Sequence, residues 1–462
     1  MTYSMHRRRF FLALVSLAFL CFLPSLLLAE EKNWKVTQET LGNGLQVVIL
    51  EDHRASVVTL QVWYKVGSRN ERPGITGLSH LLEHLMFRGT AKYGQGEFSR
   101  LVQSKGGAHN AFTADDHTVY FENAAAPHLE LLLELEADRM ANLTLDDTSF
   151  SAERKIVMEE RRMRTADEPA ADLYEQVNAA AYTAHPYGWP VVGWMNDLEK
   201  MTLVDVKAYR QIFYAPNNAI LVIAGDVTPD SVVAKIKATF GRIPAGTPTP
   251  LVTSEEPPQR GERRVTLKRP ASLPLYVAAY HVPNLKSEDS FPLALLSIVL
   301  AGGRSSRLQT SLVEQKALVL GADADYDRSS QDPPLFTLSM RLAPGKKVQD
   351  AERALYQEVE RLKNQRVNQK ELDRAKNLVE SSFVYGQDSL FYRAMQLGEY
   401  AALGDWQLIH KIIPGIRAVS AADIQRVAKT YLREDNRTVG TLVPEGKPMR
   451  ERPSSAARGP MH

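Results

Sequence analysis

The sequence has almost no cysteine. Cys21 is the only one among 462 residues, and it lies in an uncharged apolar run at residues 10–28 that follows Arg7-Arg8-Arg9 and ends at Ala29. A basic start, an apolar run and a small residue at the boundary are typical of a secretory signal, which we predict at residues 1–29. Cleavage there leaves a mature chain without cysteine, so disulfide bonds and cysteine metal ligands are excluded.

The chain also lacks a strong charge of either sign. Its formal net charge is +2, and because residues 1–29 carry three arginines and no acidic residue, cleavage changes that charge to −1. Proteins that bind nucleic acid or anionic membranes have a marked basic surface. We therefore expect no nucleic acid as a partner, and no membrane beyond the signal segment.

Residues 1–29 predict export, and a periplasmic location is the expectation. The apolar run is about as long as a short membrane span, so an uncleaved anchor is the alternative. Pro24 and the boundary between Ala29 and Glu30 favour cleavage. Leu20 precedes Cys21 where a lipoprotein signal carries a small residue, which argues against a lipoprotein.

Apolar patterns predict strands and helices in alternation. We expect strands at 36–40, 45–50, 56–66 and 219–225, two more around a polar turn at 106–121, and helices at 77–89, 94–105, 127–142 and 148–164.

A repeat within the sequence indicates two domains. Residues 55–64 and 271–280 each read as a strand that leads through a charged loop to a helix. Residues 241–264 are rich in Pro, Gly and Thr and read as a linker. We therefore predict an α+β protein with two homologous αβ domains, each a mixed, mainly antiparallel sheet with helices packed on it. The boundaries are a first domain at 30–240, a second at 265–443 and a disordered tail at 444–462.

The first domain contains the stretch His80-Leu-Leu-Glu83-His84. Four residues advance a helix by about 400°, so His80 and His84 project from one face and can bind a single ion. Glu83 lies between them, where a carboxylate can take a proton from a water activated by zinc. The alternative is two unrelated histidines on an amphipathic helix.

Three glutamates downstream are candidates for a further ligand. With no cysteine in the mature chain, a tetrahedral zinc bound by two histidines needs a carboxylate. Seven residues turn a helix by about 700°, so Glu153 and Glu160 share an apolar face with Ile156 and Val157 between them, whereas Glu159 points about 120° away. We assign Glu160 as the ligand, Glu153 as an auxiliary carboxylate and Glu159 to solvent. The alternative is a surface helix that forms ion pairs with its many arginines.

The second domain keeps the helix without its chemistry. Alignment of Leu81-Leu82 with Leu295-Leu296 places three residues at the positions of His80, Glu83 and His84, namely Ala294, Ser297 and Ile298.

Together these motifs resemble the inverted zinc-motif metallopeptidases, the family of pitrilysin, insulin-degrading enzyme and mitochondrial processing peptidase, whose signature is His-x-x-Glu-His. Residues 77–90 are similar to the zinc helix of the family. Glu160 follows His84 by 76 residues, the spacing of the family's glutamate ligand, and Glu153 matches its auxiliary glutamate. Residues 106–113 resemble its substrate-binding edge strand, and His185-Pro-Tyr-Gly188 recurs in bacterial members. The resemblance covers nearly the whole mature chain and implies a half-length, exported bacterial member.

The resemblance implies two similar domains that form half of a clamshell, with the catalytic, zinc-binding peptidase domain at 30–240. It implies one Zn²⁺ per chain and an endopeptidase that cleaves enclosed peptides or unfolded segments. Main-chain groups near Asn110, Ala111 and Phe112 would hold the substrate, and Glu83 would activate water and then protonate the leaving amine. His109 and His117 are expected as strand or turn residues.

One departure from the family concerns the second domain. Active members place an arginine and, seven residues later, a tyrosine in the substrate site, whereas this chain has Val313 and Leu320 there. Either the chain is weakly active alone, or a homologous partner supplies the pair in a heterodimer. A homodimer would lack the pair and is less expected.

Two other classes of function compete with the zinc metalloendopeptidase. The family includes non-catalytic assembly subunits, which typically carry a damaged zinc motif, whereas His80, Glu83, His84, Glu153 and Glu160 are all present here. An exported metal-binding module without catalysis has no need of a base such as Glu83.

Overall fold

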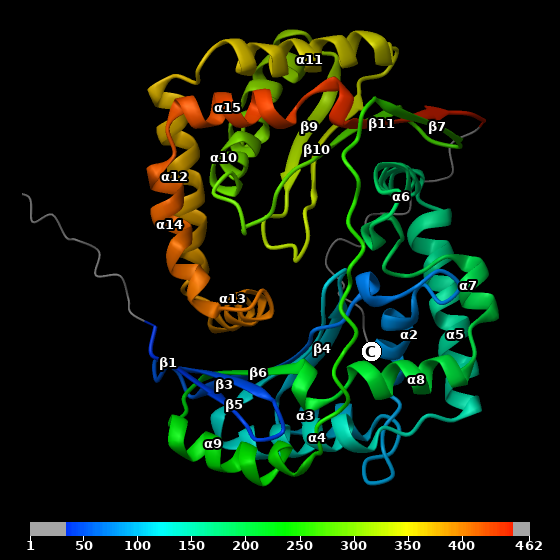
Figure 1. Cartoon of the computed structure of the whole chain (residues 1–462), viewed down its shortest axis with the longest axis vertical. Coiled ribbons are helices and arrows are strands. Elements are labelled where there is room, and N and C mark those ends of the chain that lie inside the picture. Colours follow the sequence, from blue (N-terminus) through cyan, green and yellow to red (C-terminus); the bar gives the residue numbers. More distant parts are fainter. Residues whose placement is uncertain (1–33, 447–462) are drawn as a thin grey trace, which may run out of the picture. The chain divides into compact units, whose positions relative to one another are not determined.

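Two β-sheets with helices packed on them form the frame of the protein (Figure 1), whose computed structural model describes residues 34–446. The strand order is β1-β2-β6-β3-β5-β4 in the first sheet and β7-β11-β8-β10-β9 in the second. The expected α+β architecture with two mixed, mainly antiparallel sheets is confirmed. The predicted signal segment and most of the predicted tail lie outside the described residues. Within residues 34–446, no helix is long and apolar enough to cross a membrane.

The first half of the described chain, residues 34–243, contains the first sheet. Its strands are β1 (Val36–Thr40), β2 (Gln46–Glu51), β3 (Val57–Tyr64), β4 (Ala108–Thr113), β5 (Thr118–Ala125) and β6 (Ala219–Gly225). Its helices are α2 (Leu78–Leu85), α3 (Glu97–Ser104), α4 (Leu129–Asn142), α5 (Asp147–Arg161), α6 (Pro169–Ala181), α7 (Met195–Lys200), α8 (Leu203–Phe213) and α9 (Pro229–Ala238). Short helical turns are η1 (Ser68–Asn70), η2 (Ala126–His128), η3 (Arg162–Ala166), η4 (Pro186–Gly188), η5 (Pro216–Asn218) and η6 (Phe240–Arg242).

The second half, residues 263–446, contains the second sheet. Its strands are β7 (Arg263–Arg269), β8 (Leu275–His281), β9 (Val319–Tyr326), β10 (Leu335–Leu342) and β11 (Arg437–Pro444). Its helices are α10 (Ser290–Ala301), α11 (Val348–Asn364), α12 (Gln369–Gly386), α13 (Leu390–Ala402), α14 (Ile409–Ala418) and α15 (Ala421–Tyr431). Short helical turns are η7 (Gln309–Gln315), η8 (Trp406–Leu408) and η9 (Glu434–Asn436).

The inner strands of the first sheet are buried on both faces. Successive side chains of a strand point to opposite faces, and on β3 the residues Leu60 and Val62 join the core that contains Leu81 and Leu82 of α2. Trp63 is also buried but points to the other face, where it meets a helix. This double burial explains why β2, β3 and β6 read as nearly continuous apolar runs.

The two halves of the chain exchange helices. α13 belongs to the second half by sequence but packs on β3 and β6 of the first sheet, whereas α6 belongs to the first half and packs on β7 and β11 of the second. A glycine allows the close approach in each case. A Cβ on Gly398 of α13 would lie 2.1 Å from the Trp63 ring, and a Cβ on Gly440 of β11 would lie 2.3 Å from Val177 of α6.

The predicted linker at 241–264 is irregular only between η6, which ends at Arg242, and β7, which begins at Arg263. It is tied to the first half by the carboxylate of Glu256, which accepts the backbone N–H groups of Thr183 (2.9 Å), Ala184 (2.8 Å) and His185 (3.1 Å). Three N–H donors on one carboxylate hold the segment in place, so it is an ordered connection rather than a loose tether.

Candidate active site

Helix α2 carries the His-x-x-Glu-His stretch in the interior of the first half. All eight of its residues are buried. It follows Gly77, whose φ of 86° and lack of a Cβ let the chain pass close to the Val192 carbonyl. Gly77 offers no side-chain cap, and the carboxylate of Glu71 takes that role by accepting the N–H groups of Gly77 and Ser79, both at 2.7 Å. Glu71 was not singled out from the sequence, because the cap comes from outside the usual N-cap position.

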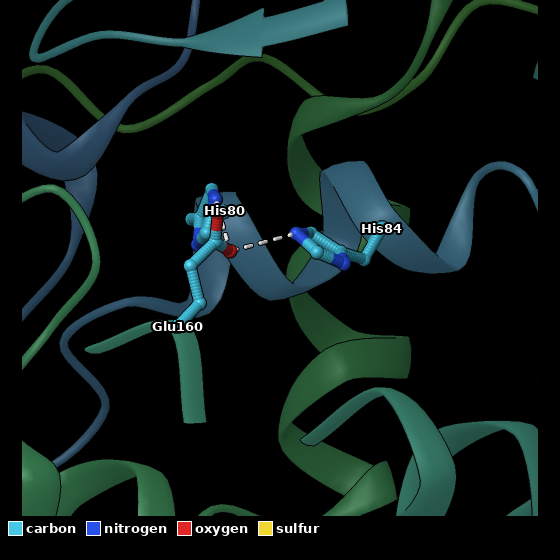
Figure 2. Close-up of side chains that lie close together, drawn as sticks. All are labelled: His80, His84 and Glu160. Atoms are coloured by element: carbon cyan, nitrogen blue, oxygen red, sulfur yellow. Dashed lines mark ion pairs between the residues drawn. The ribbon is translucent and has the colours of Figure 1, made fainter. Parts of the chain in front are cut away.

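His80, His84 and Glu160 come together in the structure, as Figure 2 shows. The two imidazoles project from α2, and the carboxylate of Glu160 reaches them from the end of α5. Glu160 Oε2 lies 3.6 Å from His80 Nε2 and 3.4 Å from His84 Nε2. His80 and His84 share one face of α2, as the helix period predicts, and the fold brings Glu160 of α5 to the same point.

These separations fit a tetrahedral metal ion. Ligand atoms about 2.0–2.2 Å from a tetrahedral zinc are about 3.3–3.6 Å from one another. The observed distances of 3.4 and 3.6 Å lie in that interval. Two imidazole nitrogens and one carboxylate oxygen are also a donor set that suits zinc. The residues present thus fit a divalent ion with one coordination position left open.

Glu160 is held in its ionised form. Burial opposes ionisation, but the hydrogen bond and charge of His84, together with His80 and Arg164, lower its pKa to about 2. Arg164 lies 2.5 Å from Glu160 Oε1, the oxygen that does not face the histidines. A carboxylate that is charged at neutral pH is the form that binds a cation.

Glu153 contacts the site through His84. Its Oε2 lies 3.0 Å from His84 Nδ1, and its other oxygen forms an ion pair with Arg88. A carboxylate on Nδ1 leaves Nε2 of the same ring to face the ligand position. Glu153 therefore lies where an auxiliary carboxylate orients a ligand. Arg88, which anchors it, was not predicted from the sequence.

The other expectations for α5 have mixed outcomes. Glu159 is exposed and pairs with Arg162 at 3.1 Å, as expected for a solvent-facing residue. Of the two apolar residues expected on the face between Glu153 and Glu160, Val157 is buried, but the prediction is wrong for Ile156, which is 48% exposed. Ile156 sits about 60° from Glu153 around the helix, far enough to reach the rim of an opening beside the site.

That opening is a cavity of about 560 Å³ next to His84 and Glu160. Its apolar lining comes from Phe87, Ile156 and Met163, and its charged lining comes from Arg88, Glu153, Glu159, Glu160 and Arg164. An apolar wall with a few charged groups is typical of a site that takes a side chain or small ligand.

Glu83 is the most deeply buried of the charged groups at the site, at 2% exposure. Burial raises its pKa, which the hydrogen bond from Thr113 partly offsets. The Thr113 hydroxyl donates to Glu83 Oε2 at 2.6 Å. A carboxyl group whose pKa is raised from its usual range toward neutrality suits a general base. Thr113 had no role assigned from the sequence, since the contact joins residues 30 apart.

The predicted substrate-binding residues lie on β4, at the edge of the first sheet. Asn110 and Phe112 are partly buried, whereas the Ala111 side chain is buried in the core. The Ala111 N–H donates to the Asn110 side-chain oxygen at 2.9 Å. Ala111 can thus act only through its main chain. The strand edge has main-chain groups that a further strand could pair with.

His109 and His117 lie apart from the three proposed ligands. His109 packs between the rings of Phe87 and Phe98, with centroids 5.6 and 5.5 Å away. His117 lies 4.8 Å from the Trp63 ring, and burial lowers its pKa to about 4. Both are surrounded by aromatic side chains, on opposite faces of the hairpin.

Val313 and Leu320 occupy different environments in the second half. Val313 is partly buried in η7, and Leu320 is 55% exposed on the edge strand β9. Both side chains are apolar, whereas the family resemblance implies an arginine and a tyrosine at these positions in active members.

Two family models match the chain in succession. "Insulinase (Peptidase family M16)" matches residues 46–193, which include all the proposed site residues, and "Peptidase M16 inactive domain" matches residues 200–379. The second match begins before the end of the first sheet, because β6 lies within it.

Similar proteins are known from several bacteria. The zinc protease PqqE of Helicobacter pylori is 34% identical over 88% of this chain and 92% of its own. An uncharacterized zinc protease of Bacillus subtilis, YmxG, is 26% identical over 87% and 96%. The crystal structure of a protease from Helicobacter pylori matches with a TM-score of 0.86, 34% identity, and coverage of 89% of this chain and 100% of that one.

A longer relative shows the same fold. The periplasmic protease PqqL of Escherichia coli matches with a TM-score of 0.75 at 18% identity, over 89% of this chain but only 48% of its own. A structure of the first half of PqqL is covered over 92% of its length, with a TM-score of 0.73. The sequence motifs, the two-sheet fold and these relatives agree, and the chain belongs to the M16 peptidases, the pitrilysin family.

Proposed function

We propose that the protein is a zinc-dependent endopeptidase that hydrolyses peptides or unfolded segments. The observation that carries this proposal is the convergence of His80, His84 and Glu160 within 4.8 Å of one another, with Glu83 on the same helix and buried beside them. An ion site alone would need no fourth group. A buried carboxyl group next to an open ligand position is what hydrolysis requires.

In this proposal His80, His84 and Glu160 hold one zinc ion. When bound, the ion supplies Lewis-acid chemistry, because it polarises a carbonyl group and makes water more acidic. Glu153 fixes the orientation of His84 by its bond to Nδ1 at 3.0 Å. Arg88 and Arg164 balance the two carboxylates from the outer side.

Glu83 moves the proton. The Thr113 hydroxyl occupies Oε2, so Oε1 of Glu83 is the oxygen left to accept a proton from water. Glu83 then donates that proton to the amine that leaves when the peptide bond breaks. Its burial raises its pKa, which strengthens Glu83 as the acceptor of the water proton.

The substrate binds in this proposal as an added strand on β4. Main-chain hydrogen bonds at a strand edge hold an extended peptide whatever its sequence, and nearby pockets set the preference. Binding through Asn110, Ala111 and Phe112 would displace the Asn110 side chain from the Ala111 N–H. Unfolded segments and peptides can form such a strand because their main-chain groups are free to pair.

A homologous partner subunit completes the site. Val313 and Leu320 cannot supply the arginine and tyrosine of active relatives, and PqqL combines this fold with about as much chain again. We infer a heterodimer in the periplasm whose other subunit carries the missing pair. A homodimer would still lack it.

Hydrolysis of a quenched fluorescent peptide library tests the proposal. The purified chain is assayed alone and after mixing with a periplasmic extract of its source, each with and without a chelator. Chelator-sensitive cleavage that Glu83→Gln abolishes supports the endopeptidase. Appearance of that cleavage only with extract identifies a partner to purify, and no cleavage in either case contradicts the proposal.

A non-catalytic assembly subunit is the second candidate. It is favoured by the lack of polar side chains at Val313 and Leu320. This candidate predicts that the purified chain cleaves no peptide, whether or not it binds zinc. It also predicts that deletion of the protein disrupts the assembly of a complex and leaves the pattern of cleaved peptides unchanged.

A further inference from the structure

The turn after β4 links the proposed base to the second sheet. Thr113, which donates to Glu83, is the last residue of β4, and Ala114 to His117 form the turn into β5. The Ala114 N–H closes this turn on the His117 carbonyl at 2.9 Å. A shift of the turn therefore reaches Thr113 through a single peptide bond.

The first half grips one side of this turn. The N–H groups of Ser68 and Arg69 donate to the carbonyls of Ala114 (3.2 Å) and Asp115 (2.9 Å), and the Ser68 hydroxyl donates to Asp115 Oδ1 at 2.8 Å. A Cβ on Gly67 would lie 2.2 Å from the Ala114 carbonyl oxygen. The turn and η1 are thus packed in backbone contact.

The second sheet holds the other side through Asp116. Residues 327–334 connect β9 to β10, and the Gln331 N–H of this connection donates to Asp116 Oδ2 at 2.9 Å. The Tyr187 hydroxyl, from η4, donates to the same carboxylate at 2.8 Å, and Arg69 forms an ion pair with it at 3.2 Å. Asp116 is therefore the point where three segments meet.

Tyr187 joins the two sides. Its hydroxyl donates to Asp116 and accepts the Asp332 N–H at 3.1 Å. Asp332 is fixed in turn by an ion pair with Arg69 and by His185 Nε2 at 3.1 Å. Although burial opposes it, the bond from His185 and the charge of Arg69 lower the pKa of Asp332 to about 2, so this carboxylate stays charged.

We propose that Tyr187 is a positioning residue for the reaction: its hydroxyl ties the β9–β10 connection of the second sheet to Asp116 and so sets, through Thr113, where Glu83 stands. The inference rests on the proposed function. It gives the half without metal-binding residues a role in the reaction, as the support against which the hairpin of β4 and β5 is held. A misplacement of a base by about 1 Å can lower the rate by up to about 100-fold.

Tyr187→Phe tests this role, and Tyr182→Phe is its matched control. Both tyrosines are 7% exposed. Both hydroxyls contact the same connection, but that of Tyr182 donates to the Pro333 carbonyl at 3.2 Å and does not touch Asp116. Each variant loses one hydroxyl and keeps its ring, so any difference between them reports the link to the turn.

We expect Tyr187→Phe to lower kcat by about tenfold with little change in KM, because the base moves while the strand edge remains. Tyr182→Phe should leave both constants unchanged. Hydrogen exchange should rise in residues 108–125 of Tyr187→Phe alone. Equal kcat values for the two variants, or faster exchange in the hairpin without a loss of kcat, would overturn the inference.

A double-variant cycle checks the route. If Tyr187 acts through Thr113, the loss of kcat caused by Tyr187→Phe disappears in a Thr113→Val background. Losses that multiply instead place the effect of Tyr187 elsewhere and overturn the inference. If the wild-type chain cleaves no peptide, the proposed function is contradicted. Hydrogen exchange then tests the inference by itself, and equal exchange rates of residues 108–125 in the Tyr187→Phe and Tyr182→Phe variants would refute it.

Discussion

Helix α2 follows β3 in the first half, helix α10 follows β8 in the second, and the two helices differ in chemistry. Leu81 and Leu82 of α2 and Leu295 and Leu296 of α10, which the sequence aligns, are all completely buried. His80, Glu83 and His84 are also buried, whereas the residues aligned with them, Ala294, Ser297 and Ile298, are half-buried. The only other half-buried residue of α10 is its last, Ala301.

The difference teaches how a helix keeps polar groups in the interior. α2 buries three such groups because each has a fixed neighbour, namely Glu160, Glu153 and Thr113. α10 carries small or apolar residues at these positions, and the one hydroxyl among them, that of Ser297, donates to the Ala294 carbonyl of the same helix. Buried polar groups persist only where they are paired, so the loss of the ligands and of their supporting residues must go together.

The largest expected effect is a difference in kcat between variants at aligned positions of α2 and α10. Glu83→Gln should lower kcat by about 10²–10⁴-fold because it removes the base, while zinc content measured by atomic absorption stays unchanged. Ser297→Ala, at the equivalent position of α10, removes a hydroxyl that only donates to the Ala294 carbonyl of its own helix, and should leave kcat as it was. Loss of activity in both variants would mean that the two helices are not divided in function as proposed.

Metal removal should act on one half alone. The ion would bridge α2 and α5. The free energy of unfolding should therefore be about 2–4 kcal/mol lower with a chelator than with saturating zinc. Hydrogen exchange should rise in α2 and α5 but not in α10 and α12, which pack on each other in the second half. A uniform rise in all four helices would contradict a site confined to the first half.

The two glycines at the exchanged helices should differ in cost. Gly398→Ala and Gly440→Ala should each destabilise the protein by about 1–3 kcal/mol through overpacking. Gly398→Ala should cost more, because a rigid indole ring opposes its Cβ, whereas Gly440 faces the ends of Val177 and Leu173 side chains. Urea unfolding measures the difference, with Gly42→Ala, which meets nothing within 4 Å, as the control.

Two acidic residues near the starts of these helices, Glu71 for α2 and Asp289 for α10, should give pH dependences of stability of opposite sign. Burial raises the pKa of Glu71 to about 8, so wild type should lose stability relative to Glu71→Gln as pH rises from about 4.5 to 8. At the start of α10, the bond from Arg426 lowers the pKa of Asp289, so its contribution is present at neutral pH and lost on acidification below its unfolded pKa of about 4. Urea midpoints of Glu71→Gln and Asp289→Asn across pH 3–9 check both signs, and parallel curves would contradict them.

Much of this could be predicted because periodicity acts over short distances. The spacing of His80 and His84 on one helix, and of Glu153 and Glu160 on another, follows from 3.6 residues per turn, and the structure brings three of these side chains to one point. Short continuous apolar runs gave β3 and β6 close to their observed bounds, because this signal is also local.

The rest depends on contacts between distant residues. Periodicity shows that α6 and α13 have an apolar face but not which sheet that face will cover, so the helix exchange could not be predicted. Thr113 lies in the edge-strand motif at residues 106–113, yet only the fold brings its hydroxyl to Glu83. Ile156 was misplaced because a position about 60° from the centre of a helix face is buried or exposed according to the neighbouring helix.

The exchange of α6 and α13 has a consequence for gene fission. If the chain were divided within residues 244–262, the N-terminal fragment would carry a sheet with one face bare and a helix without a sheet, and so would the C-terminal fragment. Each fragment would then expose the apolar surface that the other is shaped to cover. We therefore expect the two pieces to behave as a split protein, which aggregates when one piece is produced alone and reassembles when both are produced together.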